Sequence, residues 1–230
     1  MLDDASPPDE GNRQTLGVID GTATQLALGG LMLIPTALSC IFWPRALEPM
    51  LDTIEPQGRR GLFLAPGAFF LIIVLTMTIL AASLDANSGG ALAAIGRDVR
   101  GAVSEGDVWR IAALILPLFF GATMIGVLAT GAGKLAGIDR WTLTAGVRSG
   151  FYGLFGIGFF VAFSEPFTRG LGDPGNNGVV EPAVATVACL ASTWFYGSLL
   201  SRRSGWKRAS ITGALTGLPL SLFLIFTYAA

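Results

Sequence analysis

Long uncharged stretches alternate with short polar segments along most of this chain. A helix needs about 20 apolar residues to cross the hydrocarbon core of a bilayer. Five stretches suit that length, and we predict that each forms a membrane-spanning helix. They cover approximately residues 62–84, 111–132, 143–165, 180–200 and 210–229. The third reaches the required length only if its helix starts near Leu143 and Arg148 extends toward the headgroups.

A sixth hydrophobic stretch, residues 24–43, allows two interpretations. It contains no charged residue, so its length permits a crossing. Its large apolar residues fall on all sides of a helical wheel, which is not typical of a simple surface-lying amphipathic helix. Gly29, Gly30 and Pro35 weaken a regular helix. The stretch therefore either spans the membrane or forms a re-entrant or interfacial helix against the bundle.

The distribution of Lys and Arg predicts the orientation. With five spans, eleven of the 15 basic residues fall on the side that holds the N-terminus, and four fall on the other side. The four are Arg97, Arg100, Arg110 and Arg169. Segments 44–61, 133–148 and 201–208 are therefore predicted to be cytoplasmic. If residues 24–43 also cross, only Arg13 changes side, so the bias remains.

The expected fold class is all-α, a polytopic transmembrane helical bundle. Residues 1–23 are acidic and poor in apolar side chains, which predicts a mobile N-terminal tail. Residues 24–230 then form a single transmembrane domain. In the longest external connection, 85–110, Leu92, Ile95, Val99 and Val103 approximate helical spacing. This pattern predicts a short helix on the membrane surface, with a solvated loop as the alternative.

The composition agrees with a membrane location and excludes several chemistries. Charged residues make up 13% of the chain, against about 25% in soluble domains. There is no His, which excludes Ser-His-Asp triads and imidazole metal sites. Cys40 and Cys189 lie in apolar runs and are interpreted as buried thiols. We therefore predict no catalytic residue, no cofactor and no metal, and a net charge of -1 gives no reason to expect nucleic acid as a partner.

Glycines are the most informative residues within the predicted spans. The chain has 31 of them, and small residues allow helix backbones to approach closely in lipid. We predict a helix-packing face inside the bundle, with a face for a partner protein as the alternative. The candidate residues are Gly150, Gly153, Gly156, Gly213 and Gly217.

Charged residues beside the spans are the remaining candidates. Basic residues there either hold their loop in the cytoplasm or bind anionic lipid headgroups. These are Arg59, Arg60, Arg202, Arg203, Lys207 and Arg208. Glu165 and Glu181 lie at span ends, where we interpret them as interfacial carboxylates or as contacts for a partner or a cation.

Three local segments resemble the YIP family, the multispan membrane proteins that interact with Rab GTPases. They are FWPRALEPMLDTIEPQGRRGLFLAPGAFFL at 42–71, GKLAGIDRWTLTAGVRSGFYG at 133–153 and WFYGSLLSRRSGWKRASITGAL at 194–215. The resemblance covers residues 40–229. It implies five spans with a cytoplasmic N-terminus and an external C-terminus, and a non-catalytic membrane organiser or partner-binding subunit. It does not imply Rab binding here.

Together these features predict a non-catalytic membrane protein that acts as an accessory subunit or scaffold through helix–helix contacts. Membrane lipids and other membrane proteins are the expected partners. A transporter or permease component for a neutral or small solute is the alternative, and a lipid-modifying membrane enzyme is a third hypothesis. Short loops and scarce Cys favour a bacterial inner membrane.

Overall fold

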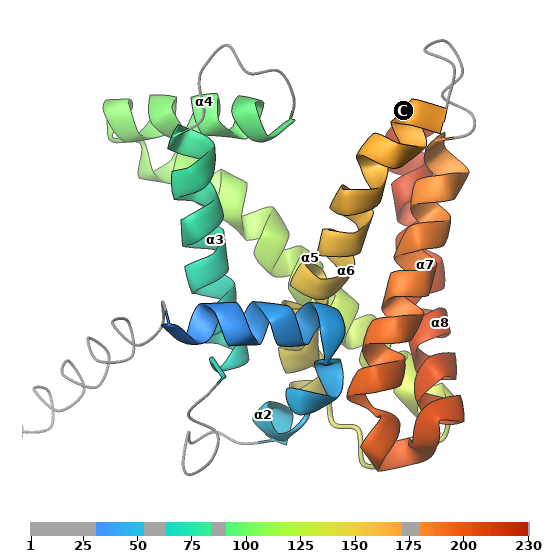
Figure 1. Cartoon of the computed structure of the whole chain (residues 1–230). Helices are drawn as coiled ribbons and strands as arrows, with labels where there is room; N and C mark the ends of the chain where they lie inside the picture. Colours follow the sequence, from blue (N-terminus) through green and yellow to red (C-terminus); the bar gives the residue numbers. More distant parts are fainter. Residues whose placement is uncertain (1–30, 53–62, 84–90, 172–179, 230) are drawn as a thin grey trace, which may run out of the picture.

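The computed structural model describes residues 31–52, 63–83, 91–171 and 180–229 (Figure 1). The tail at 1–23 lies outside these residues. Regular structure within them is helical throughout, which confirms the all-α fold. The elements are a helix at Leu31–Phe42, η1 (Pro44–Ala46), α2 (Pro49–Asp52), α3 (Pro66–Ser83), α4 (Ala91–Glu105), α5 (Val108–Leu135), α6 (Leu143–Leu171), α7 (Val180–Leu199) and α8 (Ser201–Ala229).

Helices α5 to α8 form the main bundle, in which α7 and α8 make an antiparallel hairpin and α6 contacts both α5 and α7. Helix α3 stands to one side and contacts α4 and α6. Figure 1 shows α4 lying across the end of the molecule at which α8 finishes, while α2 and the α7–α8 turn lie at the opposite end. The predicted helix within 85–110 is thus observed as α4, with Val99 and Ala102 buried.

Two helical segments in the described part of the chain are long and apolar enough to cross a membrane, Trp109–Leu135 and Leu143–Ser164. The second begins at Leu143, the start that the sequence predicted for this span. The apolar helices Leu31–Phe42 and Pro66–Ile79 are shorter, so the structure does not confirm five spans. Length and composition alone give the membrane location of these two segments only weak support.

Local sequence signals explain where several helices begin and end. The Asp107 side chain caps α5 by accepting hydrogen bonds from the backbone N–H groups of Trp109 and Arg110. Gly137 ends α5 with a φ of +77°, a left-handed conformation that favours glycine. Gly205, with a φ of +76°, interrupts α8 after its first turn. The chain therefore turns back along α7 near Gly205. The sequence pattern did not reveal this position, because the uncharged stretch begins only at residue 210.

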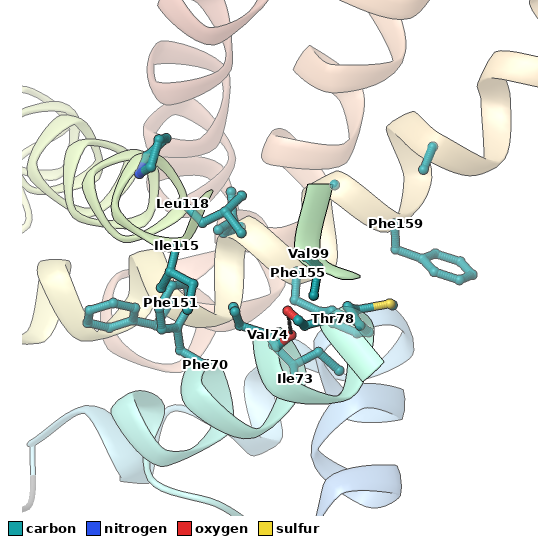
Figure 2. A pocket seen from close by; sticks show the side chains of 15 residues that line it. Phe70, Ile73, Val74, Thr78, Val99, Ile115, Leu118, Phe151, Phe155 and Phe159 are labelled. Atoms are coloured by element: carbon teal, nitrogen blue, oxygen red, sulfur yellow. Dashed lines mark hydrogen bonds between the residues drawn. The ribbon is translucent and has the colours of Figure 1, made fainter. Parts of the chain in front are cut away.

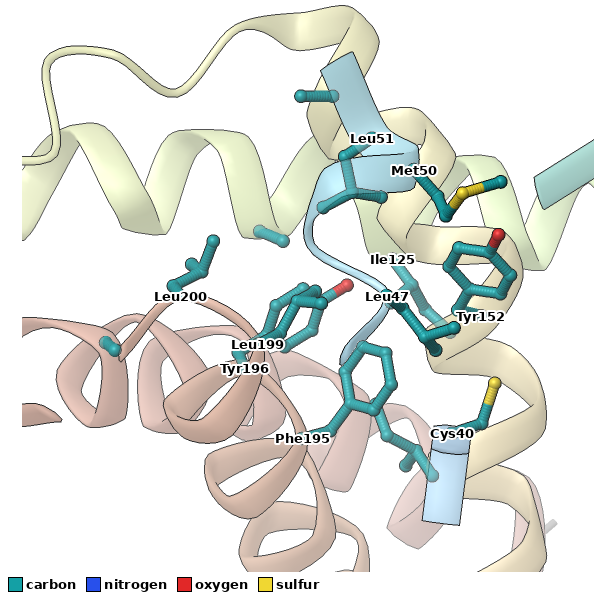
Figure 3. Packing of buried hydrophobic residues seen from close by; sticks show 14 of the residues in the cluster. Cys40, Leu47, Met50, Leu51, Ile125, Tyr152, Phe195, Tyr196, Leu199 and Leu200 are labelled. Carbon is teal, nitrogen blue, oxygen red and sulfur yellow. The ribbon is translucent and has the colours of Figure 1, made fainter. Parts of the chain in front are cut away.

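The main core forms where the segment η1–α2 inserts between α6 and α7 (Figure 3). Leu47 and Leu51 from this segment are almost completely buried. They face Tyr152 of α6 and Tyr196 and Leu199 of α7 in Figure 3. A short polar-looking segment thus supplies part of the hydrophobic centre of the bundle.

The helix Leu31–Phe42 lies crosswise to α3 and α7 in Figure 1. Its inner side is tied to the bundle at two places. The backbone N–H of Leu64 donates to Thr36 Oγ1 at 3.0 Å, and Trp194 Nε1 donates to the carbonyl of Ile41 at 3.2 Å. Its outer side exposes Leu31, Ile34, Leu38 and Phe42. This part of the ambiguous 24–43 stretch therefore has apolar side chains facing both the bundle and the surroundings; residues 24–30 lie outside the described chain.

Candidate functional site

The five candidate glycines all lie where two elements of this same chain approach closely. A Cβ built on Gly150 would lie 2.7 Å from the backbone nitrogen of Gly126 in α5. On Gly213 it would lie 2.6 Å from the carbonyl oxygen of Ser192 in α7. Gly217 meets α7 in the same way, Gly153 meets the Tyr196 and Phe195 side chains, and Gly156 meets the Cys40 carbonyl. All five are buried, and their small size allows these close approaches within the chain.

An apolar groove opens between α3, α4, α5 and α6 and has a volume of about 420 Å³ (Figure 2). Thr78 is the one polar side chain lining it in the described part of the chain, and its Oγ1 donates to the Val74 carbonyl at 2.8 Å. The described lining of the groove is therefore apolar, and the proton of its one side-chain hydroxyl is already donated within α3. Its lining comprises Phe70, Ile73, Val74, Met77, Thr78, Val99, Ile115, Pro117, Leu118, Phe151, Leu154, Phe155, Gly158, Phe159 and Ala162.

Aromatic contacts beside this groove pack α3 against α5 and α6. The Phe70 ring of α3 lies 5.2 Å from that of Phe151 and 6.1 Å from that of Phe119, centroid to centroid. Phe69 contacts Phe155 edge-on at 5.4 Å. These contacts involve the first turn of α3, whereas Met77, two turns later, is 44% exposed. The groove thus extends from Phe70 and Phe151, which line it, to the more exposed Met77.

Gly158 and Ala162 form a small-residue pair on the α6 wall of the groove. They stand four positions apart and so lie on the same face of the helix. A Cβ built on Gly158 would meet no described atom within 4 Å. Unlike the five glycines inside the bundle, Gly158 therefore faces open space within the described chain, and Ala162 is exposed.

A second cluster, which we call the charged clamp, joins Arg203 to Glu48 and Asp52 at the opposite end of the molecule. Arg203 Nε donates to Glu48 Oε1 at 2.9 Å, and its two terminal nitrogens donate to the Asp52 carboxylate. The guanidinium carbon also lies 5.7 Å from the centre of the buried Trp141 ring, within cation–π range. The clamp therefore ties η1–α2 to the α7–α8 turn and to the α5–α6 connection.

Burial and charge act in opposite directions on the clamp arginine. The side chains of Arg203 and Glu48 are only 16% and 12% exposed. Burial alone would lower the pKa of the guanidinium, but hydrogen bonds and negative charge from Asp52 and Glu48 outweigh it, so the pKa is raised. Arg148 of α6 also holds this segment, since its Nη1 donates to the Leu51 carbonyl at 3.0 Å. Arg148, which the sequence predicted to extend toward the headgroups, thus binds the backbone of α2.

The remaining candidate residues have different surroundings. Arg202 and Lys207 are exposed, and Arg208, also exposed, donates from Nη1 to the Gly137 carbonyl at 3.3 Å. Arg59 and Arg60 lie outside the described residues, and so do the side chains of Glu165 and Glu181. Arg203 differs from its neighbours because its charge is already matched by two carboxylates.

Sequence reasoning missed Glu48 and Asp52. The available signal was an acidic pair four positions apart in a segment otherwise rich in Pro and Arg. Among the residues described, no group of three or more Cys, Asp and Glu side chains lies close enough to hold a metal ion.

No family model, curated protein or solved structure matches this chain. The resemblance to the YIP family stays a prediction.

Proposed function

We propose that this chain is an integral membrane protein without catalytic activity that acts as an accessory subunit or scaffold. In this proposal a transmembrane helix of another protein lies in the apolar groove, against α6. The small-residue pair Gly158 and Ala162 within the groove carries the proposal.

The positions of exposed tryptophans support a membrane setting. The segment Trp109–Leu135 has 27 residues, and at 1.5 Å per residue it is about 40 Å long, close to the thickness of a bilayer with its headgroup regions. Trp109 at its start is 84% exposed. Trp194 and Trp206, 44% and 53% exposed, lie toward the other end, where the α7–α8 turn contacts the α5–α6 connection. Two levels of exposed Trp are typical of the two membrane–water interfaces.

The crosswise placement of helix Leu31–Phe42 favours its interpretation as an interfacial or re-entrant helix. The hydrogen bond from Trp194 to its Ile41 carbonyl supports a position near the predicted cytoplasmic interface. Its exposed apolar side would face lipid there, and its inner side rests on the bundle. We therefore count the five predicted spans without it, which keeps the N-terminus cytoplasmic.

A helix is a better occupant of the groove than lipid because of the small-residue pair. Lipid chains adapt to any apolar surface, so their binding does not require the flat strip that Gly158 and Ala162 form on α6. Residues four apart with little or no side chain let a second helix backbone approach closely, which strengthens dispersion contacts in lipid. Phe151 and Phe155 of α6 also line the groove and add aromatic surface that such a helix can contact.

The first experiment is a mild-detergent pull-down of the tagged protein from its native membrane, with mass spectrometry and a native size measurement. We expect a stoichiometric membrane partner with the wild type. Gly158→Leu should reduce its recovery at least about tenfold because the new side chain fills the helix contact. Gly131→Leu is the matched control, since Gly131 is an exposed glycine on α5 away from the groove, and a Cβ there meets no atom in the described part of the chain within 4 Å.

A photo-crosslinking residue tests the place of contact. At Phe159, in the groove, it should link to the partner, whereas at Ile211, exposed on α8, it should not. A lone monomer or homodimer in several detergents contradicts the proposal and makes transport assays the next step. Equal recovery with Gly158→Leu and Gly131→Leu contradicts the role of the groove.

A further inference from the structure

Five exposed basic side chains gather on two neighbouring connections at the end of the molecule that holds the charged clamp. We call this set the basic rim. It comprises Lys134 and Arg140, at the α5–α6 connection, and Arg202, Lys207 and Arg208, at the α7–α8 turn.

Direct contacts hold the two connections together. Arg208 Nη1 donates to the carbonyl of Gly137 at 3.3 Å. Arg203 lies over the ring of Trp141, with 5.7 Å from its guanidinium carbon to the ring centre. The basic rim is therefore one surface, although its members are separated by about 70 positions in the sequence.

Within the described part of the chain, few carboxylates are available to balance the basic rim. Asp139 is the one acidic residue within segments 133–148 and 200–208 of the sequence. The nearby carboxylates of Glu48 and Asp52 are already bound to Arg203. Among the described residues, the carboxylates of Glu48 and Asp52 are thus paired with Arg203, and Asp139 is the acidic residue of these two segments that remains beside the five cations.

Exposed apolar side chains stand beside these cations. Trp206 is 53% exposed, and its ring lies 6.1 Å from that of Trp194, which is 44% exposed. Leu135, next to Lys134, is 82% exposed. A soluble anion satisfies the cations and leaves these apolar groups in water. A phospholipid satisfies both, because its phosphate lies at the level of the cations and its acyl chains cover the apolar groups.

We propose that the basic rim binds the phosphate headgroups of anionic glycerophospholipids, with Trp206 and Leu135 against their acyl chains. The inference rests on the membrane setting proposed above and is independent of the partner helix. Arg202 and Lys207 supply charge to the headgroup, while Arg208 also holds the two connections together. Each basic side chain near an anionic membrane surface contributes roughly fivefold to binding.

The test is native mass spectrometry of the purified full chain in detergent with equimolar dioleoyl-phosphatidylglycerol and dioleoyl-phosphatidylcholine. We expect the wild type to retain the phosphatidylglycerol preferentially. The double variant Arg202→Gln/Lys207→Gln should lose at least about fivefold of that preference, and Arg202→Lys/Lys207→Arg should restore it. The matched control is Arg97→Gln/Arg110→Gln, which removes two exposed arginines at the opposite end and should keep the preference.

Three results would overturn the inference: no preference in the wild type, an equal loss in both double variants, or displacement of the lipid by millimolar inorganic phosphate. The last result would show a simple anion site. Because Arg202 and Lys207 are far from the groove, the Arg202→Gln/Lys207→Gln protein should still co-purify with the proposed partner. Failure of the lipid site and failure of the partner proposal are therefore separate outcomes.

Discussion

Gly150 stands where α6 crosses α5, and its missing side chain sets how closely the two helices approach. A Cβ there would lie closest to the backbone carbonyl oxygen of Ala122 and 2.7 Å from the backbone nitrogen of Gly126. Favourable heavy-atom separations begin at about 3.5 Å, so Gly150→Ala must move the helices apart by about 1 Å or more. The obstructing atoms belong to the backbone and have no rotamer that avoids the methyl group. Overpacking of this kind costs about 1–3 kcal/mol, and we expect about 2 kcal/mol.

The assay is the apparent melting temperature of the purified protein in one mild detergent, followed by tryptophan fluorescence. For a chain of this size, 1 kcal/mol corresponds to a shift of about 2–4 °C, so Gly150→Ala should melt about 4–8 °C below the wild type. Gly131→Ala is the control because its methyl group meets no atom within 4 Å among the described residues. Replacing a helical Gly by Ala there should leave the midpoint unchanged or raise it.

An unchanged or higher midpoint for Gly150→Ala would refute the close approach of α5 and α6 at this point. A decrease of the same size in Gly131→Ala would show that α5 and α6 respond to any added methyl group. Only a decrease confined to Gly150→Ala supports the packing role of this glycine.

Three further predictions concern contacts between distant parts of the chain, and each is measured by the same melting assay. Arg203→Gln should lower the free energy of unfolding by about 2 kcal/mol, because the side chain of Glu48 is only 12% exposed and keeps a buried unpaired charge. Asp52→Asn should lower it by less than about 1 kcal/mol, because the Asp52 side chain is 53% exposed. Equal losses would contradict this ranking. The pKa of Arg203 is raised, so the stability that its charge contributes is complete below the ordinary, strongly alkaline pKa of arginine. That stability is lost only as pH rises through the raised pKa. The stability difference between wild type and Arg203→Gln should therefore stay constant from about pH 6 to 9. Tyr152→Phe should lower the free energy of unfolding by about 1–2 kcal/mol, because the Tyr152 hydroxyl donates to the buried Leu64 carbonyl and the variant leaves that acceptor unpaired. A melting midpoint equal to that of the wild type would show that another donor replaces the hydroxyl.

The hydrophobic pattern predicted the positions of the long helices well. The predicted stretches 111–132, 143–165 and 180–200 correspond to α5 (Val108–Leu135), α6 (Leu143–Leu171) and α7 (Val180–Leu199). This success has a local cause, because uncharged length and helix capping depend on residues near each other in the chain. α8 begins earlier than the predicted 210, since charged residues of its first turns can be helical without being apolar.

The sequence by itself determined the helical class, the approximate helix boundaries and the absence of histidine chemistry. Only the tertiary structure decided what the individual side chains do. Gly150 and Gly158 lie on one helix with similar neighbours in sequence, yet one meets the backbone of α5 and the other faces an open groove. Arg203 looks like its neighbour Arg202, but it alone reaches Glu48, 155 positions earlier. Such roles depend on which helices meet and at what distance, and no local pattern encodes that geometry.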